Sequence, residues 1–149
     1  MRLPALVPEL SVSNISRSLA FYCDLLGFAL RYQRVEEGFA FLDLGQASLM
    51  LDQSGVGRDW VTGPLEKPLG RGINLQIQFD DLSPALQRLA AAQVALFTPL
   101  ETKAYQAGEH IIRQRQFCVQ DPDGYLLRCC QLLARDNPDG MDETGKITQ

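Results

Sequence analysis

Val12-Ser-Asn-Ile-Ser-Arg-Ser-Leu19 and Phe79-Asp-Asp-Leu-Ser-Pro-Ala-Leu86 have the same layout. Each stretch holds an apolar residue that ends a strand, a polar pair able to cap a helix, another apolar residue, a Ser, and a Leu at the start of a helix. Such a repeat indicates that one supersecondary unit occurs twice along the chain. The sequence therefore predicts two modules of the same element order, and a position in one module can be compared with its counterpart in the other.

The first module, residues 1–52, is predicted to have the order β-α-β-β-β. Residues 7–12 alternate between apolar and polar side chains, which predicts a strand. The helix that follows is expected to be capped by Ser13 or Asn14 and to end at Gly27. Further strands are expected at residues 28–34, 39–44 and 48–52.

The second module, residues 73–134, is predicted to repeat this order. Its first strand alternates most clearly, and four of its side chains are expected to face the core: Ile73, Leu75, Ile77 and Phe79. A helix is expected to begin at Ser83, with Pro84 in its first turn. Strands should follow near Leu96 and at residues 111–120 and 125–132, the last two joined by the turn Asp121-Pro-Asp-Gly124.

Residues 53–72, rich in Gly and Pro, are expected to form a surface linker between the modules, and residues 135–149 a flexible polar tail. The fold class is α+β. Two tandem βαβββ modules should form a concave, partly open mixed sheet with helices on its outer face, within one structural domain. A concave sheet of this kind can hold a ligand.

Composition limits the classes of partner. The chain has 149 residues, a net charge of −4 and a pI near 4.9. Nucleic-acid binding is disfavoured because a phosphate-binding surface is normally basic. No apolar run approaches the roughly 20 residues that span a bilayer, and the N-terminus lacks the apolar core of a signal peptide. We therefore expect a cytoplasmic protein that binds neither nucleic acid nor membranes.

Four cysteines lie in apolar stretches: Cys23, Cys118, Cys129 and Cys130. No two are spaced as Cys-x-x-Cys, so buried, reduced thiols are expected. A redox pair of Cys129 and Cys130 is the less favoured alternative, because neighbouring strand residues point to opposite faces.

Three motifs resemble those of the glyoxalase/bleomycin-resistance/extradiol dioxygenase superfamily, which has the vicinal oxygen chelate fold. The family's opening signature is similar to the stretch Val12–Tyr22 followed by Leu25-Leu-Gly-Phe28 in this chain. The start of the family's second module resembles Phe79-Asp-Asp-Leu82, and its closing signature resembles Asp121-Pro-Asp-Gly-Tyr-Leu-Leu-Arg128. Together the motifs cover about residues 7–132 in the family's order and spacing.

The resemblance also implies where the family's enzymes hold a divalent metal ion. The matching positions here are Val7, Asn74 and Arg128, with a further position at Met50 or Asp52. Valine has no donor atom, an amide is a weak ligand and a guanidinium is a permanent cation. The chain's one histidine, His110, has no companion at ligand spacing. We therefore expect neither a metal nor another cofactor.

The chain is most similar to the metal-free, bleomycin-resistance-like branch, whose members sequester antibiotics as homodimers with ligand clefts at the subunit boundary. The resemblance thus implies a homodimer and a role in antibiotic resistance. One departure concerns the ligand: Arg113 stands where these proteins commonly place a tryptophan. Bleomycin carries a cationic tail, whereas Arg113 and Arg115 would suit an anionic or carbonyl-rich ligand.

Strand alternation and the resemblance together give a set of candidate ligand-binding residues. The set is Glu9, Phe39, Phe41, Met50, Asp52, Trp60, Asn74, Gln76, Arg113, Arg115 and Arg128. Other interpretations stay open: Arg128 could pair with Glu9 or Asp52 as a structural ion pair, Phe41 and Met50 could belong to a dimer core, and Trp60 could be a lid over the cleft or an anchor of the linker.

The first hypothesis for function is a binding protein that sequesters a drug-sized, partly aromatic antibiotic or metabolite without chemistry. The second is an enzyme of the same fold, an isomerase or lyase with Glu9 or Asp52 as the base. The third is a dimerisation or regulatory module with a vestigial cleft, which a cleft filled by its own side chains would favour.

Overall fold

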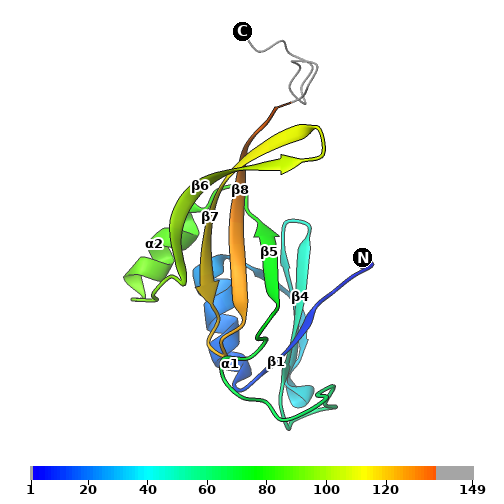
Figure 1. Ribbon diagram of the computed structural model, residues 1–149. Helices are drawn as coiled ribbons and strands as arrows, with labels where there is room; N and C mark the ends of the chain where they lie inside the picture. The colour runs from blue at the N-terminus through cyan, green and yellow to red at the C-terminus, as the bar shows by residue number, and fades with distance from the viewer. Residues whose placement is uncertain (1, 137–149) are drawn as a thin grey trace.

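The structure is a computed structural model, and it describes residues 2–136. Two four-stranded sheets, one for each module, are arranged with the helices α1 and α2 beside them (Figure 1). The strand order is β1-β4-β3-β2 in the first sheet and β5-β8-β7-β6 in the second, so the two sheets have equivalent topology. The predicted α+β fold of two tandem βαβββ modules is therefore confirmed.

The first module begins with β1 and a helix that starts as α1 and continues as a π-helix, η1. The Asn14 side chain caps α1 by accepting a hydrogen bond from the Arg17 backbone N–H over 3.0 Å. Gly27 ends η1 with a φ of 94°, a left-handed conformation that glycine adopts without a steric penalty. The elements are β1 (Glu9–Val12), α1 (Ile15–Leu19), η1 (Ala20–Leu26), β2 (Ala29–Arg34), the 3-10 turn η2 (Val35–Glu37), β3 (Phe39–Leu44) and β4 (Ala47–Gln53).

The second module repeats this order, with longer strands in its second half. Its elements are β5 (Asn74–Gln78), α2 (Ser83–Ala91), β6 (Thr98–Ala107), β7 (His110–Gln120) and β8 (Leu126–Asp136). Figure 1 shows the β6–β7 hairpin extending beyond the rest of its sheet. Strand β8 runs two residues into the predicted tail, and residues 137–149 lie outside the described residues.

One prediction about the core is wrong. Ile73 is 57% exposed, although its alternation with Ile77 and Phe79 placed it in the core. The strand begins only at Asn74, and Ile73 closes a turn by donating its N–H to the Gly70 carbonyl over 3.1 Å. Ile73 therefore precedes β5, whose later residue Ile77 packs in the core.

The two modules share one hydrophobic core. The apolar faces of both sheets contribute to it, as do the helices, with Tyr22, Leu82, Phe117 and Leu127 fully buried. The two helical segments are tied together where Arg88 Nε of α2 donates to the carbonyl of Leu25 in η1 over 2.8 Å. None of the helices within residues 2–136 is long and apolar enough to cross a membrane.

The turn between β7 and β8 joins the second module to the first. The Tyr22 hydroxyl donates to Asp121 Oδ2 over 2.7 Å, and both side chains are buried. The Ser13 hydroxyl donates to Asp123 Oδ1 over 2.6 Å, and Lys67 Nζ lies 3.4 Å from the same oxygen. The predicted turn is thus also the polar connection that fixes one module on the other.

Candidate functional site

One face of the first sheet carries the densest group of candidate residues. In the strand register Glu9 pairs with Met50, Phe41 with Met50, and Phe39 with Asp52. The alternate positions Leu10, Leu51, Ala40 and Leu42 are buried in the core. Because successive strand residues point to opposite faces, this pairing places the polar and aromatic candidates together on the face away from the core.

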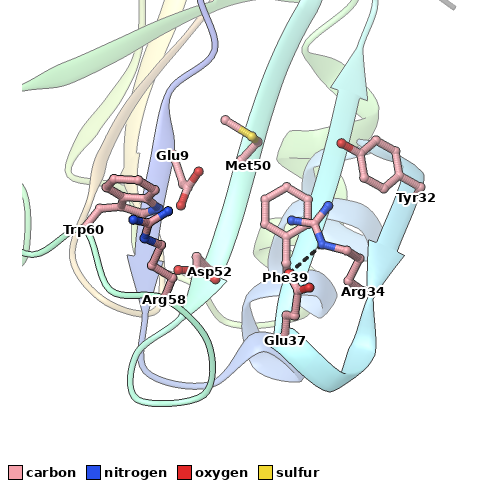
Figure 2. Close-up of a pocket in the computed structure, with 9 residues that line it drawn as sticks. All are labelled: Glu9, Tyr32, Arg34, Glu37, Phe39, Met50, Asp52, Arg58 and Trp60. Carbon is pink, nitrogen blue, oxygen red and sulfur yellow. Dashed lines mark hydrogen bonds and ion pairs between the residues drawn. The ribbon is translucent and has the colours of Figure 1, made fainter.

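A pocket of about 340 Å³ lies on this face, and we call it the first-sheet pocket (Figure 2). It is lined by Glu9, Tyr32, Arg34, Glu37, Phe39, Met50, Asp52, Arg58 and Trp60. Five of these were predicted from the sequence: Glu9, Phe39, Met50, Asp52 and Trp60. The pocket is not filled by its own side chains, which does not favour a vestigial cleft.

Stacked rings and guanidinium groups form one wall of the first-sheet pocket. Tyr32 stacks on Phe41 with their ring centroids 5.4 Å apart, and Tyr32 lies 5.9 Å from Phe39. The Arg34 guanidinium lies over the Phe39 ring at 3.9 Å and that of Arg31 over the Phe41 ring at 4.5 Å. Phe41 therefore supports the wall from beside the pocket. Such cation–π contacts hold the rings and guanidinium groups in register.

Both arginines of this wall are neutralised by carboxylates of their own. Arg34 Nε lies 2.6 Å from Glu37 Oε2, and Arg31 binds Asp43 through two nitrogen atoms. These two cations are therefore engaged first with neighbouring anions, and Arg34 offsets the other carboxylates of the pocket only in part.

Glu9 and Asp52 are the chemically distinctive pair of the pocket. Neither carboxylate accepts a hydrogen bond or forms an ion pair with any part of residues 2–136, and Asp52 is only 7% exposed. Burial raises the pKa of Glu9 above its ordinary value, and the Asp52 charge raises it further while Arg34 opposes the shift. Burial also raises the pKa of Asp52, with the Asp59 charge adding to the effect. The pocket thus holds two carboxylates without a hydrogen-bond or ion-pair partner among residues 2–136, and Arg34 offsets their charge only in part.

Trp60 stands at the edge of the first-sheet pocket, opposite the aromatic wall. Figure 2 shows the Glu9 side chain between Trp60 and Met50. The Trp60 side chain is 65% exposed, and the Arg58 guanidinium covers its ring at 4.6 Å. An exposed ring at the rim of a pocket fits a lid better than an anchor for the linker.

Three other candidates lie together on the second sheet, outside the first-sheet pocket. Asn74 pairs with Leu126 and Gln76 with Arg128, on the face away from the core. Arg128 Nη2 donates to Gln76 Oε1 over 2.6 Å, while Arg128 Nε is buried without a hydrogen-bond partner. The ion pair of Arg128 with Glu9 or Asp52 is not present among residues 2–136, so that alternative is not supported.

Arg115, a predicted ligand-binding residue, does not lie on the face that carries the other candidates. In the register Arg115 pairs with Gln131 and Phe117 with Cys129, and Phe117 is fully buried in the core. Residues 115 and 117 share one side of β7, so Arg115 faces the helix side of the sheet, whereas the register of β7 with β8 shifts between Arg113 and Gln114 and alternation does not place Arg113. The sequence did carry this signal, because Phe117 had to face the core. Neither Arg113 nor Arg115 lines the first-sheet pocket, so these two residues do not favour an anionic ligand there.

Four lining residues were missed by the sequence analysis: Tyr32, Arg34, Glu37 and Arg58. A bulge between Leu30 and Tyr32 shifts the register of β2, so simple alternation along this strand does not predict its face. Glu37 and Arg58 lie in a turn and in the linker, where no period applies.

The residues at the family's metal positions do not fit a divalent cation. Arg128 and Asn74 occupy two of them, and a guanidinium repels a metal ion. Within residues 2–136 there is no group of three or more His, Cys, Asp or Glu side chains placed to hold one. Metal chemistry therefore enters no step proposed below.

Comparison with known proteins gives concordant similarities. The sequence model of the Glyoxalase/Bleomycin resistance protein/Dioxygenase superfamily matches residues 5–129. A bleomycin resistance protein of Geobacillus stearothermophilus is 25% identical over 135 residues, which cover 85% of this chain and 96% of that protein. A protein of unknown function from Agrobacterium tumefaciens C58 has a TM-score of 0.65 at 27% identity, covering 89% of this chain and 97% of that one. TioX from Micromonospora sp. ML1 shares the fold, with a TM-score of 0.64 at 22% identity, covering 86% and 98%.

Proposed function

This chain belongs to the glyoxalase/bleomycin resistance protein/dioxygenase superfamily, and we propose that it is a metal-free, cytoplasmic binding protein that sequesters a cationic, partly aromatic small molecule. The ligand lies in the first-sheet pocket, and no covalent chemistry is required. Protection against a toxic compound then follows from mass action, because bound compound is removed from the free pool.

The observation that carries this proposal is the unpartnered pair Glu9 and Asp52 beside a wall of aromatic rings. Asp52 is buried without a partner, which is unfavourable, and a ligand cation between Asp52 and the more exposed Glu9 would remove that cost. Planar groups of the ligand would stack against Phe39 and Trp60. Cationic charge and planar rings are both features of bleomycin, the drug in the name of the curated relatives, which makes bleomycin the first compound to test.

We further propose that a second copy of the chain completes the cleft. Within one chain the carboxylates of the first sheet and the Gln76–Arg128 pair of the second lie in separate places. A homodimer that sets the second sheet of one copy against the first sheet of the other would cover both. The opposite charges of Arg128 and the Glu9–Asp52 pair support this arrangement.

The test measures thermal stabilisation and calorimetric affinity with bleomycin and with a cationic acridine. We expect a higher melting temperature, since a ligand at 100 times its Kd adds about 2.7 kcal/mol of stability. Removing both charges with Glu9→Gln and Asp52→Asn should weaken binding at least tenfold. Glu36→Gln, which removes an exposed acid outside the pocket, should leave the affinity unchanged.

Two results would contradict the proposal. One is the absence of stabilisation by any cationic aromatic compound, together with binding of their anionic analogues. The other is equal affinity of the double variant and Glu36→Gln. Sedimentation with and without compound tests the homodimer separately. A monomer that binds bleomycin with full affinity would refute only the proposal that a second copy completes the cleft.

A second candidate function rests on the place of Glu9 in the first-sheet pocket, where its carboxylate has no hydrogen-bond partner among residues 2–136 and burial raises its pKa in the direction that suits a general base. In that case the pocket holds an isomerase or lyase. Recovery of the bound compound distinguishes the two functions: a binding protein returns it unchanged, whereas an enzyme alters it, and Glu9→Gln would abolish that conversion.

A further inference from the structure

A second pocket, of about 460 Å³, lies on the helix side of the molecule and takes no part in the function proposed above. We call it the helix pocket. Three segments enclose it: the α1–η1 helix, the end of α2, and the end of β7 with its following turn. Its lining residues are Arg17, Ala20, Phe21, Asp24, Leu25, Ala92, Val94, Gln120, Asp121 and Pro122.

The walls of the helix pocket are held in place by bonds between the three segments. Arg88 Nε of α2 donates to the Leu25 carbonyl over 2.8 Å, and the Tyr22 hydroxyl of η1 donates to Asp121 Oδ2 over 2.7 Å. Both bonds connect elements that face each other across the pocket. Ligand sites are usually largely preformed, and these connections keep the helix pocket open without a ligand.

Two backbone features border the same space. Seven residues of its longest wall, Ala20–Leu26, form a π-helix, a rare conformation that is frequent at functional sites. Gln93, between the lining residues Ala92 and Val94, has a φ of 58° and closes the end of α2, where the N–H groups of Gln93 and Val94 donate to the Ala90 and Leu89 carbonyls. This helix end fixes the position of Ala92 and Val94 on the wall that faces the π-helix.

The chemistry of the lining is that of an apolar floor between two opposite charges. Ala20, Phe21 and Leu25 form the floor along the helix. Asp121 also lines the pocket, but its two oxygens already accept hydrogen bonds from Tyr22, Asp123 and Tyr125. Arg17 and Asp24 stand toward the two ends of the floor, and neither side chain has an ion-pair partner within residues 2–136. Seven positions along the helix separate them, at most roughly 10 Å along the axis at the α-helical rise of about 1.5 Å per residue, because the π-helical residues Ala20–Leu26 rise less. A matching ligand has an apolar body with a carboxylate at one end and an ammonium group at the other.

We propose that the helix pocket binds a short apolar peptide with free termini. Three extended residues span roughly 10 Å, at about 3.3–3.6 Å per residue, which matches the separation of the two charged residues. The carboxylate of the peptide lies at Arg17 and its amino group at Asp24, with the apolar side chains over Phe21 and Leu25. Gln120 lies at the edge of the pocket with its amide nitrogen donating to the Gly124 carbonyl over 3.3 Å, and its Oε1 could accept from a peptide N–H.

The probe is the tripeptide Leu-Phe-Leu, titrated into ¹⁵N-labelled protein. We expect saturable shifts confined to residues 17–25, 92–94 and 120–122. The N-acetylated and the C-amidated tripeptide should each bind about tenfold more weakly, because each has lost one terminal charge. Titrating the same peptides into charge variants shows which residue binds which end of the peptide. In Arg17→Gln the C-amidated tripeptide should bind as well as the free one, and in Asp24→Asn the N-acetylated tripeptide should bind as well as the free one.

Controls keep this test separate from the first-sheet pocket. Glu36→Gln should bind the peptide as the parent chain does, while Arg17→Gln and Asp24→Asn should bind bleomycin as the parent does. Arg17 and Asp24 are exposed, so neither variant should impair folding. The proposal is overturned if no saturation occurs at millimolar peptide, if blocking the termini changes nothing, or if the shifts map to residues 39–52.

Discussion

Replacing Tyr22 by Phe tests how the two modules are held together. The hydroxyl of Tyr22 is fully buried and donates to Asp121 Oδ2 over 2.7 Å, across the boundary between the modules. The other oxygen, Oδ1, accepts from the backbone N–H groups of Asp123 and Tyr125 over 2.9 and 3.0 Å. The substitution therefore removes one of three donors to a buried carboxylate and leaves the aromatic packing in place.

The expected cost follows from the kind of bond that is lost. A hydrogen bond to a charged group contributes about 1.5–3 kcal/mol to stability. For a chain of this size each kcal/mol lowers the melting temperature by roughly 2–4 °C. Tyr22→Phe should therefore lower the free energy of unfolding by about 2 kcal/mol, seen as a lower urea midpoint with an unchanged slope.

The dependence of this cost on pH is the sharper part of the prediction. Burial raises the pKa of Asp121 in the folded chain, and the bond from Tyr22 limits that rise. Without the bond, the pKa of Asp121 in the folded chain rises further above its value in the unfolded chain. The Tyr22→Phe variant therefore loses additional stability as pH increases through the folded-state pKa of Asp121. The cost of Tyr22→Phe should thus be complete at neutral pH and shrink as pH falls toward the unfolded pKa of about 3.9.

Tyr125→Phe is the matched control. Its hydroxyl donates to the backbone carbonyl of Ser11 over 2.9 Å, so the change removes a tyrosine hydroxyl from a neutral acceptor. We expect a loss of about 0.5–1.5 kcal/mol with little dependence on pH. Equal losses for the two variants at every pH would refute the role assigned to the Tyr22–Asp121 bond.

Three further changes have definite expected outcomes. Asp52→Asn should raise the free energy of unfolding at pH 7, because burial raises the pKa of Asp52 and its ionised form opposes folding. This gain in stability should vanish below about pH 4, where the carboxyl group is protonated in the unfolded chain as well. Urea unfolding at several pH values measures the gain. Gly124→Ala should lower the melting temperature, since φ is +98° and the new Cβ would lie 2.5 Å from Pro68 Cβ; a stability equal to the parent would contradict this. Phe117→Ala, in the shared core, should cost about 3–5 kcal/mol by calorimetry, and a cost below 1 kcal/mol would show that Phe117 is not packed as described.

Much of the fold could be predicted because its signals are local. The repeat at Val12 and Phe79 predicted two equivalent modules, and the structure has two sheets of the same strand order. The helix begins after its cap Asn14 and ends at Gly27, as the sequence indicated, because capping depends on residues within one turn of the helix end. Alternation also identified the face that carries Glu9 and Asp52, since each strand has one buried side.

The composition of the candidate site depended on contacts that no local pattern encodes. The bulge in β2 brings Tyr32 and Arg34 into the first-sheet pocket, and the linker brings Arg58 to Trp60. Pairing of β7 with β8 turns Arg115 toward the helices and leaves Arg128 bonded to Gln76. Alternation says only that neighbouring residues face opposite ways; which face meets the core is settled when distant strands pair and bury their apolar sides together. The charge of the pocket, and with it the kind of ligand proposed, therefore follows from the folded arrangement.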